Sequence, residues 1–187
     1  MYKEFKKFGR MLFDQGLNNS HSGNMSVRKG ATIIITRHGA KLSDIEKNSL
    51  VTVNLNNTTK DKDASVEVIV HRAIYQTCPG VNAIVHAHNP HGIVLSLNQK
   101  EITPIDMEGS YYIDMIPVLE CKVAIASCEV AQRLPALIQK HKVAMVKGHG
   151  VFAGGKTLEE ATMLASVAES VSKIIYLDKI FRFCRKS

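Results

Sequence analysis

Short apolar runs alternate with helical patterns along this chain, and this alternation limits the folds that it can adopt. Runs of this length and β-branched content are typical of strands, and they predict strands at 25–27, 32–36, 50–55, 81–85, 115–118 and 143–146. Helical spacing and end signals predict helices over 1–16, 65–78, 89–97 and 127–140, and a long helix after Thr157. Because a strict βαβ rhythm and a Gly-x-Gly-x-x-Gly motif are both missing, the pattern favours a mixed α/β sheet with helices on its faces.

The length and composition fit one ordinary globular domain. The 187 residues include 45% hydrophobic and 22% charged residues, which is far from the composition of disordered chains. Neither a repeat nor a linker divides the chain. We therefore expect a single domain over residues 1–187.

The first residues and the net charge bear on location and partners. The segment MYKEFKKFGRMLFDQG mixes charged with apolar residues, unlike a signal peptide, and no run reaches the ~18 apolar residues of a membrane span. We therefore expect a cytoplasmic protein with no membrane partner. The net charge of +7 favours anionic partners, such as nucleic acid or a phosphorylated metabolite. Dispersed lysines, 6% aromatic residues and no Trp argue against nucleic acid and fit an ordinary basic surface.

Three histidines stand at the ends of predicted strands. The run VNAIVHAHNPHG places His86 and His88 two residues apart at a strand end, so both imidazoles project from the same face. The run VAMVKGHG places His149 between two glycines after another strand. Three such imidazoles could hold a catalytic zinc ion with an open fourth position. The His-x-His pair alone fits ordinary polar strand-end residues equally well, and the separate Gly-His-Gly favours a metal site.

Other polar residues leave two interpretations open. Glu67 lies near the start of a predicted helix, where a carboxylate can simply stabilise the helix N-terminus. It could instead lie beside the metal and move a proton. The segments 22–24 (SGN) and 36–39 (TRHG) are typical of turns, but both could also present backbone N–H groups to a phosphate.

Taken in order, the motifs resemble one known family. The segments SGNMSVR, IITRHG, ASVEVIVHRAIY, VNAIVHAHNPH and KGHGVFAGG, followed by a long helix, are similar to the class II aldolase/adducin-like family, and especially to its L-fuculose-1-phosphate aldolase branch. The resemblance covers about residues 12–178. It implies a three-layer α/β/α sandwich with a mainly antiparallel or mixed sheet, and commonly a homotetramer with active sites at subunit borders.

The resemblance also implies a chemistry. It implies Zn²⁺, or another divalent transition metal, held by His86, His88 and His149, with Glu67 as an added ligand and as the acid/base. The implied reaction splits a ketose 1-phosphate, such as L-fuculose 1-phosphate, into dihydroxyacetone phosphate and a short aldehyde through a metal-stabilised enediolate. The phosphorylated sugar would be bound by Asn24, His38, Gly39 and Ser65.

The chain departs from the family pattern at the substrate positions. His38-Gly39 stands where Thr-Gly is usual, and Val66 stands where a second Ser is usual. The aldehyde-side tyrosine of the aldolases would fall near Met107, where Tyr111 and Tyr112 are the nearest tyrosines. Two phosphate donors are therefore altered, so we expect the anionic end of this chain's substrate to differ from the usual one of the family.

Three alternative functions have different signatures. A ribulose-phosphate 4-epimerase tends to carry Asp at the position of Glu67, so the sequence disfavours it. A methylthioribulose-1-phosphate dehydratase would keep the same metal site. A non-catalytic adducin-like interaction module lacks the metal ligands, and the presence of all three histidines argues against it.

Overall fold

The computed structural model describes residues 1–59 and 61–185. Within these residues, the strands are β1 (Asn24–Lys29), β2 (Thr32–Thr36), β3 (Leu50–Asn54), β4 (Ala83–Ala87), β5 (Glu101–Ile102), β6 (Ile116–Leu119), β7 (Val143–Val146) and β8 (Gly150–Gly155). The helices are α1 (Tyr2–Asp14), α2 (Val68–Thr77), α3 (Pro90–Ser96), α4 (Met107–Tyr112), α5 (Cys128–His141) and α6 (Leu158–Cys184), with short 3₁₀ turns at Leu42–Asp44 and Lys47–Ser49.

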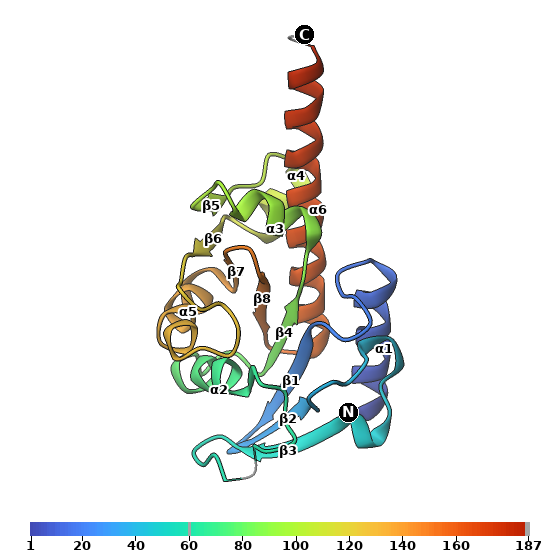
Figure 1. Cartoon of the computed structure of the whole chain (residues 1–187), viewed down its shortest axis with the longest axis vertical. Coiled ribbons are helices and arrows are strands. Elements are labelled where there is room, and N and C mark those ends of the chain that lie inside the picture. The colour runs from blue at the N-terminus through green and yellow to red at the C-terminus, as the bar shows by residue number, and fades with distance from the viewer. Residues whose placement is uncertain (60, 186–187) are drawn as a thin grey trace.

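The strands form one mixed sheet between two helical layers (Figure 1). The strand order over the described residues is β3-β2-β1-β4-β8-β7-β6-β5. The β6–β7 pair is parallel and the other neighbouring pairs are antiparallel. Helices α2 and α5 pack on one face, and α1, α3 and α6 pack on the other. The expected three-layer, mainly antiparallel α/β sandwich is therefore confirmed.

Strand alternation decides which side chains face which layer. On β4, Ala83 and Val85 join the core under α1 and α6, whereas Ile84 joins the core under α2 and α5. His86 follows the alternation of Ile84, and its ring stacks on Phe152 at a centroid distance of 4.1 Å. His86 therefore faces the α2 side of the sheet.

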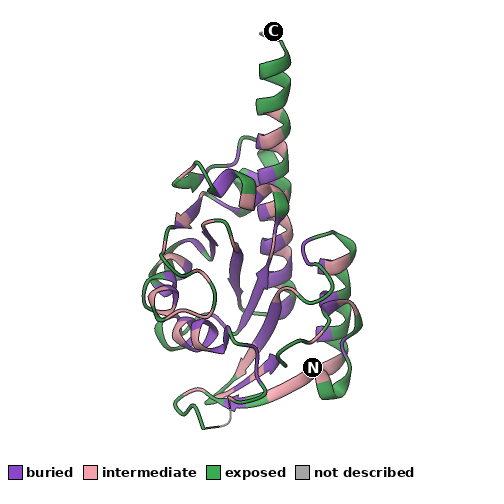
Figure 2. Cartoon of the chain, viewed as in Figure 1, coloured by how far each residue is buried: buried purple, intermediate pink, exposed green. Residues whose placement is uncertain are grey.

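The long helix α6 projects beyond the sheet. Figure 2 shows its first part buried against the sheet and its last turns exposed. The exposed end carries apolar side chains, including Leu177, Ile180 and Phe181. None of the helices in the described part of the chain is long and apolar enough to cross a membrane.

The observed elements differ from the predicted ones at several places, among them the short strand β5, which was not predicted. Strand β8 was not predicted, because the segment GVFAGG contains three glycines and glycine has low β propensity. Helix α4 lies in a stretch with no clear periodicity, and only Gly109 of its residues is buried. Helix α2 begins at Val68 with Glu67 as its N-cap residue, although a helix start at Ser65 was predicted.

A row of polar side chains is buried between α2 and β1. The Ser26 hydroxyl lies 2.7 Å from Nδ1 of His71 and 2.7 Å from the hydroxyl of Tyr75. All three residues are buried. Burial lowers the pKa of His71 to about 3, because a charged imidazolium loses its hydration there. His71 is therefore neutral in the folded protein at neutral pH.

This burial predicts an acid-sensitive stability. Between about pH 6.5 and pH 3, the unfolded chain binds a proton at His71 and the folded chain does not. The free energy of unfolding should therefore fall as the pH falls through this window. In His71→Asn, the slope should be shallower by up to about 1.4 kcal/mol per pH unit, as measured by urea unfolding at several pH values. Equal slopes in the two proteins would show that His71 ionises while folded.

Candidate functional site

Three imidazoles converge at one end of β4 and β8. His86 is in β4, His88 follows it, and His149 directly precedes β8. One ring nitrogen from each residue lies within 4.8 Å of the others, and the Nε2 atoms of His86 and His88 are 3.1 Å apart. Three imidazole nitrogens at this spacing are a donor set that suits zinc and similar transition metals. These residues could therefore hold one divalent ion.

Strand pairing brings these distant residues together. β4 and β8 are antiparallel neighbours, with Ala87 opposite Val151, so the end of one strand meets the start of the other. Gly150 permits this close approach. A Cβ atom at Gly150 would lie 2.4 Å from the carbonyl oxygen of Ala87, 3.0 Å from Cδ2 of His88 and 3.1 Å from Cε1 of His86. A side chain there would displace the imidazoles.

The surroundings of the rings suit metal ligands. Nδ1 of His86 donates to the carbonyl oxygen of Val151 at 3.0 Å, which leaves Nε2 with the free lone pair. Burial lowers the pKa of His86 and of His88. Burial and the neighbouring His88 together lower the pKa of His149 to about 4, against a backbone hydrogen bond at Ala124 that raises it. All three imidazoles are therefore neutral at neutral pH, as metal binding requires.

A buried donor atom supports the fit of a metal here. Nδ1 of His149 is buried and has no hydrogen-bond partner among the described residues. Buried polar atoms are nearly always satisfied, so an unpartnered ring nitrogen beside two other imidazoles suggests a ligand atom. Glu67 is not part of the tight three-nitrogen group, although it lines the same pocket.

Glu67 is held at the start of α2 by a loop between β6 and α5. The residue is only 3% exposed, and its Oε1 accepts a hydrogen bond from the backbone N–H of Ala126 at 3.1 Å. Its Oε2 is buried without a partner in the described part of the chain. Burial raises the pKa of Glu67, and the Ala126 N–H partly opposes this. A carboxyl group whose pKa is raised by burial holds its proton more readily and is suited to proton exchange.

The pocket gathers the residues that the motifs singled out. It has a volume of about 410 Å³. Its walls include every predicted site residue, namely Asn24, His38, Gly39, Ser65, Glu67, His86, His88 and His149. The same walls also contain His21, Ser22, Gly23, Arg37, Ala40, Val66 and Ile125. The turns around 22–24 and 36–39 thus lie beside the histidines, where a small anionic ligand would meet basic groups.

Some contributors to the site carry no signal in the sequence. Ile125 lines the pocket, and Ala126 contributes only its backbone N–H. Ala126 has a φ of 49°, a left-handed conformation that a residue with a Cβ atom rarely adopts. Nothing in an alanine within an aperiodic segment indicates such a role, so only the structure could identify it.

Sequence and fold both relate the chain to known proteins. The family model described as Class II Aldolase and Adducin N-terminal domain matches residues 3–176. The chain belongs to this family. A curated relative in it, the L-fuculose phosphate aldolase of Methanococcus maripaludis, is 30% identical over 175 residues, which cover 93% of this chain and 95% of that protein.

Two further relatives show the range of the family. The protein named 5-methylthioribulose-1-phosphate/5-deoxyribulose-1-phosphate aldolase of Rhodospirillum rubrum is 27% identical over 169 residues, which cover 88% of this chain and 75% of that protein. The crystal structure of L-fuculose-1-phosphate aldolase from Thermus thermophilus has a TM-score of 0.93 and 32% identity, over 97% of this chain and 95% of that one. The fold of this family member is therefore shared almost end to end.

The close approach at Gly150 yields a stability prediction. Gly150→Ala should lower the free energy of unfolding by about 1–3 kcal/mol, because the new methyl group overlaps the Ala87 carbonyl and the two histidine rings. The matched control is Gly80→Ala, since nothing lies within 4 Å of a Cβ atom there. The control should stay within about 0.5 kcal/mol of the wild type. Equal values for the two variants in chemical denaturation would contradict the packing at Gly150.

Proposed function

We propose that this chain is a divalent-metal aldolase that cleaves a ketose 1-phosphate, such as L-fuculose 1-phosphate, into dihydroxyacetone phosphate and a short aldehyde. The observation that carries the proposal is the group of three imidazoles within 4.8 Å of one another in a pocket that also contains buried Glu67. Relatives named as sugar-phosphate aldolases support the substrate class.

Each part of the site has a place in this chemistry. His86, His88 and His149 would hold the ion, with Glu67 as a further ligand, and the cation would polarise the oxygen atoms of the hydroxyketone. Zinc is the first choice, because three imidazoles with an open position form a typical catalytic zinc site. Asn24, His38, Gly39 and Ser65 line the part of the pocket where the phosphate would bind.

Glu67 would carry the proton that the cleavage reaction requires. When the carbon–carbon bond breaks, the hydroxyl proton leaves the aldehyde side and the bonding electron pair stays on the hydroxyketone fragment. A proton must then reach that carbon. Glu67 is the buried carboxyl group of this pocket, and its raised pKa suits it to carry that proton.

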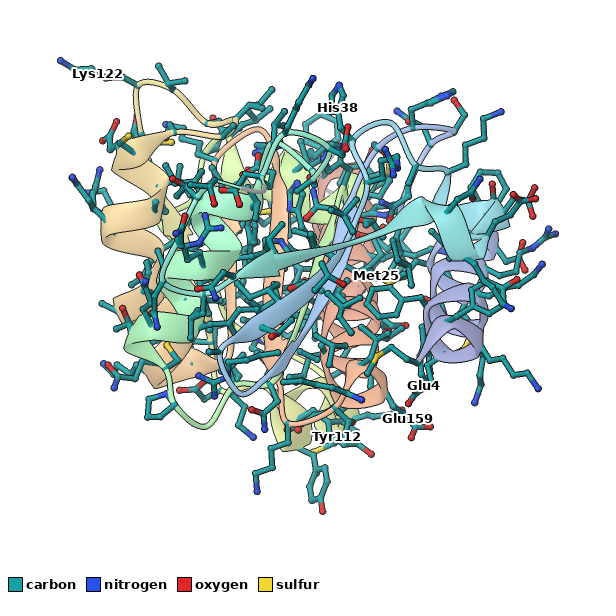
Figure 3. All side chains as sticks on the ribbon, turned by 90° about the horizontal axis from the view of Figure 1, so that it is seen from below. Glu4, Met25, His38, Tyr112, Lys122 and Glu159 are labelled. Carbon is teal, nitrogen blue, oxygen red and sulfur yellow. The ribbon has the colours of Figure 1, made fainter. Side chains whose placement is uncertain are left out.

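Among the described residues, no tyrosine lines this pocket to accept the proton on the aldehyde side. Tyr111 is 82% exposed and Tyr112 is 44% exposed, both on α4. Neither lines the pocket, and Figure 3 shows Tyr112 and His38 at opposite edges of the chain. A tyrosine from α4 could therefore serve only the pocket of another copy. This arrangement supports the proposal of a homotetramer with active sites at subunit borders; a cytoplasmic location remains a prediction.

The substrate panel should separate the candidate reactions. Purified protein should be incubated with ketose 1-phosphates and pentulose phosphates, with and without a chelator, and the products identified. The aldolase proposal expects dihydroxyacetone phosphate and an aldehyde. The relative named for 5-methylthioribulose 1-phosphate makes that sugar a second candidate substrate of the same cleavage. Loss of water or epimerisation without cleavage would instead indicate the dehydratase or the 4-epimerase.

The metal site makes a direct prediction. Purified protein should contain about one zinc-like ion per chain by elemental analysis, and His149→Ala should lose it, because the remaining pair of imidazoles holds a metal weakly. His21→Ala removes another imidazole of the same pocket, outside the three-nitrogen group, and should keep the ion. Protein without metal after reconstitution with zinc would refute the site.

A second prediction separates proton transfer from metal binding. Glu67→Gln preserves the shape of the side chain but cannot carry the proton, so kcat should fall by ~10² or more while metal content stays near the wild-type level. Glu4→Gln, on an exposed part of α1, serves as the control and should leave kcat unchanged. Unchanged turnover in Glu67→Gln would remove this residue from the mechanism.

A further inference from the structure

The buried row of Tyr75, Ser26 and His71 includes the residue one helical turn after Glu67. The three side chains are 1%, 0% and 0% exposed, and the two hydroxyl contacts are both 2.7 Å long. His71 lies one helical turn after Glu67 on α2, and its backbone N–H donates to the Glu67 carbonyl oxygen at 3.1 Å. Residues one turn apart share a face of a helix. His71 and the proposed acid/base therefore lie on the same side of α2.

The hydrogen bonds in this row have a direction. Burial raises the pKa of Tyr75, so the phenol keeps its proton. A buried phenol O–H needs an acceptor, and among the described residues the side-chain oxygen within hydrogen-bonding distance is the Ser26 hydroxyl; we therefore take Ser26 as the acceptor for the phenol proton. Ser26 must then give its own proton to Nδ1 of His71. A neutral imidazole that accepts at Nδ1 carries its proton at Nε2.

Two complementary atoms are left without partners. Nε2 of His71 and Oε2 of Glu67 are both buried, and neither has a hydrogen-bond partner in the described part of the chain. The direction of the row makes the first atom a donor, and the carboxylate oxygen is an acceptor. Leaving such atoms unsatisfied is costly, and a hydrogen bond between them would satisfy both.

We propose that His71 is a positioning residue for Glu67, whose Nε2–H takes the Glu67 carboxylate as its partner during the reaction. This inference rests on the proposed function, because it assigns Glu67 the proton transfer. Tyr75 and Ser26 fix the tautomer of His71, and His71 in turn fixes one position of the carboxylate. The second oxygen, Oε1, accepts the Ala126 N–H and keeps a further lone pair with which to exchange a proton with the substrate.

A purely structural role for His71 is the competing explanation. Its ring lies edge-on to Phe152, with centroids 6.0 Å apart, and Phe152 stacks on His86. If His71 acted only by packing, its replacement would disturb the metal ligands through Phe152. Metal content and KM would then change together with kcat. A positioning role predicts a change in kcat alone.

Two variants divide the functions of the imidazole. In His71→Asn, the amide can still meet Ser26 but does not reach the place of Nε2. In His71→Gln, the amide N–H reaches that place but loses Ser26. We expect His71→Asn to lower kcat by about 10- to 100-fold with metal content and KM near the wild-type values, and His71→Gln to recover most of the loss. Equal kcat values for the two variants would overturn the proposal.

Nitrogen-15 NMR of the histidine rings tests the same point without turnover. The wild type should show His71 protonated at Nε2 and not at Nδ1, and Glu67→Gln should shift the Nε2 resonance of His71. His91, whose Nδ1 lies 2.6 Å from Glu169, is the internal control and should not shift. Protonation at Nδ1, or an Nε2 resonance that ignores Glu67→Gln, would refute the positioning role. This readout decides the question even if both His71 variants fail to fold.

The two proposals can fail separately. If the wild type cleaves no sugar phosphate but the NMR results hold, the proposed function fails and the His71–Glu67 contact stands. If cleavage occurs and His71→Asn retains full kcat, the proposed function stands and the positioning role fails.

Discussion

The antiparallel pairing of β4 with β8 is the contact on which the site depends. It places the end of one buried strand, with His86 and His88, against the start of another, next to His149. Ordinary backbone hydrogen bonds thus bring together imidazoles that are far apart in the sequence. Gly150 at this crossing leaves room for the rings. The helical layers bury this pair of strands. Glu67, at the start of α2, and the segments 22–24 and 36–39, beside β1 and β2, line the same pocket.

The site also contains buried polar groups that are left unsatisfied. Buried atoms without partners in the described residues include Nδ1 of His149, Oε2 of Glu67, Nε2 of His71 and Oδ1 of Asn24. In a folded protein such atoms are rare, and those of Asn24, Glu67 and His149 belong to residues that line one pocket, as expected of a site that binds ligands. The left-handed Ala126 adds backbone strain at the same location. Both features lower the stability of the fold at the place where we propose ligand binding and proton transfer.

The sequence predicts the architecture well wherever one physical signal dominates. β-branched runs such as TIIIT became strands, and the Thr157 cap began a long helix. The three histidines could be recognised because a His-x-His pair and a separate Gly-His-Gly both follow predicted strands. Strand β8 escaped prediction because its glycines serve the close approach at Gly150, which depends on a partner strand. Ala126 and the buried Ser26–His71–Tyr75 row escaped because their roles arise from tertiary contacts and from backbone atoms.

The central claim is that His86, His88 and His149 hold one divalent ion. The most direct test is zinc-edge X-ray absorption on the zinc-loaded wild-type protein. The account predicts three imidazole nitrogens at about 2.0–2.1 Å from the metal, with oxygen completing the coordination. A spectrum with sulfur ligands, or with fewer than three imidazoles, would place the ion elsewhere and contradict the account.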